Sequence, residues 1–105
     1  MVTKYSVKLS RAACHDLEEI FSYIANALSA EQAANDLMRE IHEMILSLDE
    51  MPGRFALSLD TTLAAKVYRC TLVKKYVILY SIDEEKKIVN VARIFHGSTD
   101  YAKYI

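Results

Sequence analysis

The chain has 105 residues, of which 52% are hydrophobic and 26% are charged, and its formal net charge is −1. This length and composition suit one folded domain over residues 1–105 with a hydrophobic core, and they exclude an intrinsically disordered chain. The balance of 13 basic and 14 acidic residues gives no global attraction for polyanions, so we expect no direct binding of free nucleic acid or of anionic membranes.

The cysteines and histidines show none of the spacings that are typical of metal or redox sites. Cys14 and Cys70 stand far apart, and His15, His42 and His96 are equally scattered. No apolar run approaches the roughly 20 residues that span a bilayer, and no secretory signal opens the sequence. We therefore expect a cytoplasmic protein with reduced thiols, no metal and no cofactor.

The first half of the sequence predicts one strand followed by two helices. Residues 5–9 alternate between apolar and polar side chains, as a half-buried strand does, and Ser10 then suits a helix N-cap. An apolar stripe at three- and four-residue steps follows. Ser29 and Gln32 have the spacing of a capping box, which predicts a second helix that ends before residues 51–53. The short connection indicates an antiparallel helical hairpin.

The second half predicts three strands in series, over 66–73, 76–82 and 88–95. Lys74-Lys75 suits a tight turn, and the charged residues 83–87 form the next one. The order is thus β-α-α-β-β-β. The expected fold is a two-layer α+β domain in which an antiparallel meander, joined by the first strand, carries the helical hairpin on one face. The other face should be at least partly open to water or to a partner.

Four segments that together span nearly the whole chain carry a family resemblance. They are Y-S-V-K-L-S with the helix that follows it, S-L-x-x-M-P-G-R at 47–54, V-Y-R-C-T-L-V-K-K-Y-V-I-L-Y-S-I-D at 67–83, and R-I-F-H-G-S-T-D at 93–100. In order and spacing they resemble the RelE/ParE superfamily of bacterial type II toxins, in its ParE-like, plasmid-stabilisation branch. The resemblance implies a growth-inhibiting toxin that a cognate antitoxin protein holds inactive. It also implies one of two targets, because ParE-like members poison DNA gyrase whereas RelE-like members cut mRNA on the ribosome.

RNA cleavage needs a base, an acid and fixed cations near the scissile phosphate. Where RelE-like enzymes often carry an arginine after the central-strand tyrosine, this chain has Val77, and residues 97–99 are Gly, Ser and Thr where further cations would follow. Arg69 is the strand-borne arginine that the family pattern retains. A ribonuclease site would have to combine His96, Arg69 and Tyr80. Histidine suits proton transfer near neutral pH, but a ring at a strand end more often braces the following turn.

A binding site for a target or an antitoxin would instead draw on residues at the end of the last strand and on the open sheet face. The expected contacts are Arg69, Arg93, His96, Asp100 and Tyr101. Arg93 is also a candidate for a structural ion pair with Asp83 or Asp100. His96, Ser98 and Asp100 do not predict a catalytic triad, because triads are assembled in space rather than within one short run.

The missing cations favour a toxin that binds its target, such as DNA gyrase, over an enzyme. The alternatives are a RelE-like ribosome-dependent mRNA endonuclease and a degenerate toxin without activity.

Overall fold

The computed structural model describes residues 4–57 and 67–98. Its elements are β1 (Ser6–Leu9), α1 (Arg11–Ser22), a π-helix (Tyr23–Ala27), α2 (Glu31–Ser47), a 3-10 helix (Pro52–Arg54), β2 (Arg69–Val73), β3 (Tyr76–Asp83) and β4 (Ile88–His96). The predicted order β-α-α-β-β-β is confirmed. None of the helices in the described ranges is both long and apolar enough to cross a membrane.

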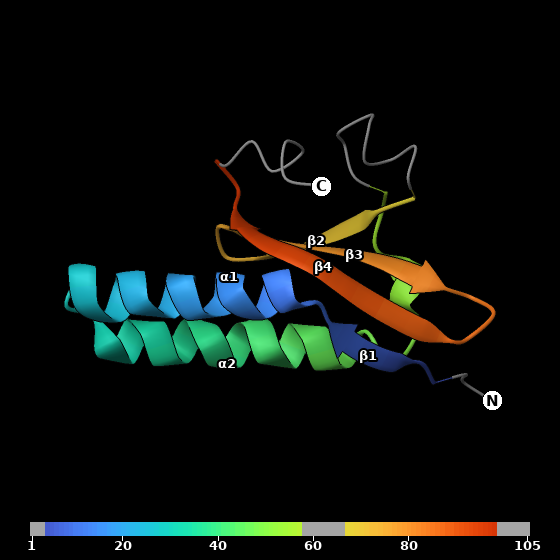
Figure 1. Cartoon of the computed structure of the whole chain (residues 1–105), viewed down its shortest axis with the longest axis horizontal. Coiled ribbons are helices and arrows are strands. Elements are labelled where there is room, and N and C mark those ends of the chain that lie inside the picture. Colours follow the sequence, from blue (N-terminus) through green and yellow to red (C-terminus); the bar gives the residue numbers. More distant parts are fainter. Residues whose placement is uncertain (1–3, 58–66, 99–105) are drawn as a thin grey trace.

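The strands form one four-stranded sheet in the order β1-β4-β3-β2 (Figure 1). β2, β3 and β4 are antiparallel neighbours, as expected of a meander, but β1 pairs with β4 in parallel, so the sheet is mixed. A parallel partner requires a crossover connection, which the helical hairpin and the first two strands of the meander provide. Both helices lie along the same side of the sheet (Figure 1), which confirms the two-layer α+β class.

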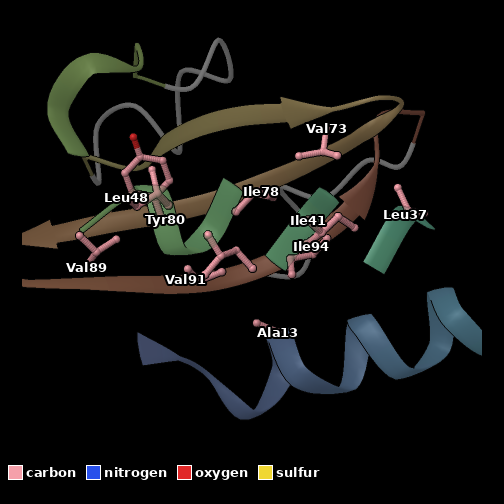
Figure 2. Packing of buried hydrophobic residues seen from close by; sticks show 11 residues of the cluster. Ala13, Leu37, Ile41, Leu48, Val73, Ile78, Tyr80, Val89, Val91 and Ile94 are labelled. Carbon is pink, nitrogen blue, oxygen red and sulfur yellow. The ribbon is translucent and has the colours of Figure 1, made fainter. Parts of the chain in front are cut away.

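The hydrophobic core fills the space between the helices and the inner face of the sheet (Figure 2). Alternate residues of β3 point into it, because successive side chains of a strand point to opposite faces. The cluster contains Ala13 of α1, Leu37, Ile41, Ile45 and Leu48 of α2 and its C-cap, and Val73, Ile78, Tyr80, Val89, Val91 and Ile94 of the strands. These residues hold the sheet and the hairpin in a fixed relative position.

The outer face of the sheet is less open than the sequence suggests. Leu72, on the edge strand β2, is 62% exposed, which agrees with a partly open face. Its cross-strand neighbour Val77, and Leu79 and Phe95 further into the sheet, are buried. The middle of this face is therefore not available as a flat binding surface.

The two helices begin differently. Ser10 is the N-cap of α1 as predicted, since its Oγ accepts a hydrogen bond from the Ala13 N–H at 2.9 Å. The capping box predicted for the second helix is wrong. Ser29 has a left-handed φ of 50°, the N-cap is Ala30, and the Gln32 side chain donates to Asp36 instead. We attribute this to the preceding π-helix. Its wide turn carries the chain past Ser29, so that α2 starts only after Ala30.

A β-bulge changes which residues of β4 face the helices. The pairing with β3 shifts by one residue between Leu79 and Tyr80, so that Tyr80 pairs with Val91 but Leu79 pairs with Arg93. A one-residue shift moves every later side chain to the other face. As a result Val91 and Ile94 both point into the core, and His96 comes to lie opposite Tyr76.

Candidate functional site

One cavity, which we call the end notch, lies where β3 and β4 meet α1 and the π-helix. Its volume is about 480 Å³, within the roughly 300–1,000 Å³ of small-ligand pockets. The side chains that give it polar or aromatic character are Asp16, Glu19, Tyr23, Tyr76, Arg93 and His96. A smaller pocket of about 260 Å³ lies beside it and shares Tyr76 and His96, with Lys74 and Lys75 in its wall.

His96 is held at the rim of the end notch by its neighbours. The Ser98 N–H donates to its Nδ1 at 3.1 Å, and the Ser98 Oγ lies 2.7 Å from the same atom. Because Nδ1 accepts the backbone N–H, the neutral ring carries its hydrogen on Nε2. The Tyr76 ring meets the imidazole edge-on, with centroids 5.4 Å apart. His96 thus braces the turn at Gly97, whose N–H donates to the Lys75 carbonyl at 2.7 Å.

Asp16 and Arg93 form a bidentate ion pair on the inner wall of the end notch. Arg93 Nε and Nη2 donate to the two carboxylate oxygens at 2.8 and 2.9 Å, and the Ile94 N–H donates to the same carboxylate at 2.9 Å. β1 pairs with β4 only as far as Val91. Asp16 therefore satisfies a backbone donor on the β4 edge that β1 does not reach.

The structural ion pair expected for Arg93 is present, but Asp83 is not its partner. Asp83 instead accepts the Lys86 N–H within the turn between β3 and β4. Arg93 also lies over the Phe95 ring, at 4.5 Å from its centroid. Asp100 and Tyr101, the other residues predicted to make contacts, lie outside the described residues.

Arg69 and Tyr80 lie directly across from each other on β2 and β3, at what we call the closed end of the sheet. Arg69 Nη1 donates to the Phe55 carbonyl at 2.7 Å, and the Tyr80 hydroxyl donates to the Pro52 carbonyl. Together they hold the 3-10 helix against the sheet. Tyr80 is fully buried, and this burial raises its pKa to about 12, although the nearby Arg69 and Arg54 guanidiniums lower it slightly.

The M-P-G-R segment ends α2 beside the closed end. Arg54 Nη1 donates to the Glu50 carbonyl at 2.7 Å and to the Ser47 carbonyl at 3.2 Å, so it ties the 3-10 helix to the C-terminal end of α2 and to the turn that follows it. Its guanidinium also lies over the Phe55 ring. This motif of the sequence thus has a structural function.

The structure does not bring His96, Arg69 and Tyr80 together. His96 pairs with Tyr76, and Tyr80 lies four positions further along β3. At a rise of about 3.3 Å per residue, that separation is about 13 Å. Arg69 and Tyr80 therefore lie at the closed end, and His96 lies at the end notch.

Sequence reasoning missed Asp16, Glu19, Tyr23 and Tyr76. Asp16 gave a usable signal, because an acid within the apolar stripe of a helix must find a partner when it is buried. The pairing of Tyr76 with His96 gave only an indirect signal, since it depends on the bulge. The described residues contain no group of three potential ligands for a metal. Burial raises the pKa of the Cys70 thiol, which keeps it protonated.

Comparison with known proteins identifies the family. The model of the ParE toxin of the type II toxin–antitoxin system parDE matches residues 7–101. The chain belongs to the ParE toxin family. The predicted resemblance to the RelE/ParE superfamily is therefore confirmed. A search of curated proteins gives no match.

Solved structures share the fold of this ParE-family chain. The chromosomal ParDE toxin–antitoxin system from P. aeruginosa has a TM-score of 0.71 at 18% identity, covering 90% of this chain and 97% of that one. The RelBE2 toxin–antitoxin complex from Mycobacterium tuberculosis has a TM-score of 0.61 at 24% identity, covering 89% and 98%. At these identities the likeness concerns the fold.

Proposed function

We propose that this ParE-family chain is a cytoplasmic toxin that arrests growth by binding a target protein such as DNA gyrase, and that a cognate antitoxin neutralises it. The family match supports the toxin role. The main support for a toxin that acts by binding is that the groups that RNA cleavage would need lie apart. His96 and Tyr80 lie about 13 Å apart along the sheet, and Tyr80 is fully buried, which disfavours a shared contact with one substrate phosphate.

The arginines that would stabilise charge on a phosphate are bound to other groups. Arg69 donates to a backbone carbonyl, and Arg93 is held by the Asp16 carboxylate. Tyr80 has no exposed surface and its hydroxyl donates to the Pro52 carbonyl, so it is not placed to exchange a proton with a substrate. Electrostatic stabilisation is usually the largest catalytic contribution, so this arrangement favours a binding toxin over a nuclease.

A second candidate function has one observation in its favour. His96 directs Nε2 away from Ser98, next to Tyr76, and Lys74 and Lys75 line the adjoining pocket. A RelE-like mRNA endonuclease could use these residues in place of Arg69 and Tyr80. However, Lys74 pairs with Glu40 at 3.5 Å, which leaves less positive charge for a phosphate. A degenerate toxin without activity is the third candidate.

An antitoxin would find a suitable surface on the helical side of the molecule. An apolar groove of about 410 Å³ runs between β1 and the two helices, with Val7, Leu9, Leu17, Met38, Ile41 and Ile45 among its lining residues. Such a groove suits the apolar face of a partner helix or an extended segment. Both similar solved structures are described as toxin–antitoxin systems or complexes.

The test is to induce the chain alone and to follow growth, the SOS response, trapped gyrase–DNA complexes and mRNA integrity by primer extension. We expect arrest with trapped complexes and intact mRNA, and we expect His96→Ala to remain toxic. Arrest with normal gyrase and mRNA cleavage that His96→Ala abolishes would support the endonuclease instead. Normal growth of cells that contain the folded chain would indicate a degenerate toxin. Co-expression of the small protein encoded in the adjacent reading frame should restore growth if that protein is the antitoxin.

A further inference from the structure

Two departures from regular geometry shape the wall of the end notch. The last turn of α1 widens into the π-helix Tyr23–Ala27, and the β3–β4 pairing contains the bulge at Leu79 and Tyr80. The first places Tyr23 in the wall of the notch, and the second places His96 opposite Tyr76. π-turns and β-bulges interrupt regular hydrogen bonding and are frequent at functional sites. The π-helix lies at the notch itself, whereas the bulge lies nearer the closed end and acts on the notch through the register of β4.

The wall of the notch is largely aromatic. Tyr23 is 58% exposed, and Tyr76 and His96 form an edge-to-face pair that lines the same notch. Burial and, to a smaller extent, the neighbouring Tyr23 raise the pKa of Tyr76, which is consistent with two phenols close together. Ring faces carry negative partial charge and attract cations.

The charged groups of the notch also favour a cation as the ligand. The positive charge of Arg93 is already matched by both oxygens of Asp16. The Glu19 carboxylate lies 2.9 Å from the His15 imidazole, and both side chains are mostly exposed. A carboxylate beside two tyrosine rings is therefore accessible to a ligand. The lysines nearby lie in the wall of the adjoining pocket, across the Tyr76–His96 pair.

We propose that the end notch binds an arginine side chain presented by a protein partner. The guanidinium would lie against the ring of Tyr23 or Tyr76 and donate hydrogen bonds to the Glu19 carboxylate. Arginine fits this geometry better than lysine, because its planar group can stack on a ring and donate to a carboxylate at the same time. The notch is separate from the apolar groove on the helical side, and the inference does not depend on whether gyrase is the target.

The test uses the full chain, titrated with N-acetyl-arginine amide while the tyrosine ring signals and the backbone amides of α1 are followed by NMR. We expect saturable shifts centred on Tyr23, Tyr76 and Glu19. N-acetyl-citrulline amide has nearly the same shape without the charge, so it should bind at least about fivefold more weakly. N-acetyl-lysine amide should be intermediate, and N-acetyl-tryptophan amide should not compete.

Three variants distinguish the notch from general surface charge. Glu19→Gln and Tyr23→Leu should each weaken arginine-amide binding by about fivefold or more. Glu18→Gln is the matched control, since Glu18 is the adjacent exposed acid and is not in the wall of the notch. Equal binding of the citrulline and arginine amides, equal effects of the two glutamate variants, or shifts that do not saturate would each overturn the proposal. The growth assay is independent, so toxicity with no arginine binding would reject this inference alone.

Discussion

The same sheet carries a tyrosine beside a basic residue at each end, and the two pairs are in opposite states. At the closed end, Tyr80 faces Arg69, and both side chains donate to backbone carbonyls of the 52–55 segment. At the end notch, Tyr76 faces His96, and their rings border a cavity of about 480 Å³. Identical secondary structure and similar residue types therefore do not decide whether a pair is structural or accessible.

The difference comes from what packs over each pair. The chain that follows α2 folds back over the closed end as a 3-10 helix, so the polar atoms of that end find partners within the protein. Over the other end lies the π-helix, where α1 stops being regular. Buried residues, at the closed end above all, should therefore determine stability, whereas the exposed residues of the end notch should determine binding. The following predictions test that division.

The largest expected loss of stability comes from the replacement of Tyr80. Tyr80→Ala should lower the free energy of unfolding by about 3–5 kcal/mol, because it removes a fully buried ring and leaves a cavity. The matched change at the other end, Tyr76→Ala, should cost about 1–2 kcal/mol, since Tyr76 is only half-buried. Urea unfolding of both variants measures the difference. Equal losses would mean that the two ends do not differ in the way described.

Removal of the buried carboxylate should have the next largest effect. Asp16→Asn keeps the size of the side chain but weakens the bonds to Arg93 and to the Ile94 N–H, so we expect a loss of about 2 kcal/mol. Hydrogen exchange at the Ile94 amide should become faster than in the native chain. Glu18→Gln on the same helix is the control and should change stability by less than about 0.5 kcal/mol. A similar result for both variants would show that the ion pair does not hold the β4 edge.

Asp16 and Ser29 illustrate what a sequence can and cannot predict. The fold followed from periodicity, because strands and amphipathic helices repeat at different intervals and the turns carry their own residues. Ser10 acted as the predicted N-cap, since a regular strand-to-helix turn precedes α1. Ser29 did not, because the π-helix changed the path of the chain before α2. Local patterns fail where the preceding element ends irregularly.

The candidate site was less predictable because it depends on register. If β3 and β4 paired without a bulge, Tyr76 would lie opposite Phe95, and His96 would point to the other face of the sheet. The bulge moves His96 onto the face of Tyr76. The sequence holds a trace of this shift, since the core-facing apolar residues of β4 change from odd to even positions between Val91 and Ile94. The structural role of Tyr80 is hidden in the sequence, because its partner Pro52 lies 28 positions away.

The response to alkaline pH should also separate the two ends. The pKa of Tyr80 is raised from 10.0 to about 12 in the folded chain, so the folded state keeps a proton that the unfolded state releases. The stability that this provides is fully present below pH 10 and is lost as the pH rises from 10 toward 12. Tyr80→Phe should remove that part of the decline. Tyr76→Phe should remove less of it, although the pKa of Tyr76 is raised too. Urea unfolding at pH 9 and pH 11 measures both, and an unchanged decline in Tyr80→Phe would contradict the assignment.

The smallest expected effect concerns the hydroxyl beside His96. Ser98→Ala removes the Oγ at 2.7 Å from Nδ1 but keeps the backbone N–H that donates to the same atom. We therefore expect stability to change by less than about 0.5 kcal/mol, and the neutral ring to keep its hydrogen on Nε2. Nitrogen-15 NMR of the imidazole reports the tautomer directly. A switch to the Nδ1–H form would mean that the hydroxyl, rather than the backbone of the turn, orients His96. The end notch would then depend on a replaceable side chain, whereas the closed end is held by main-chain carbonyls.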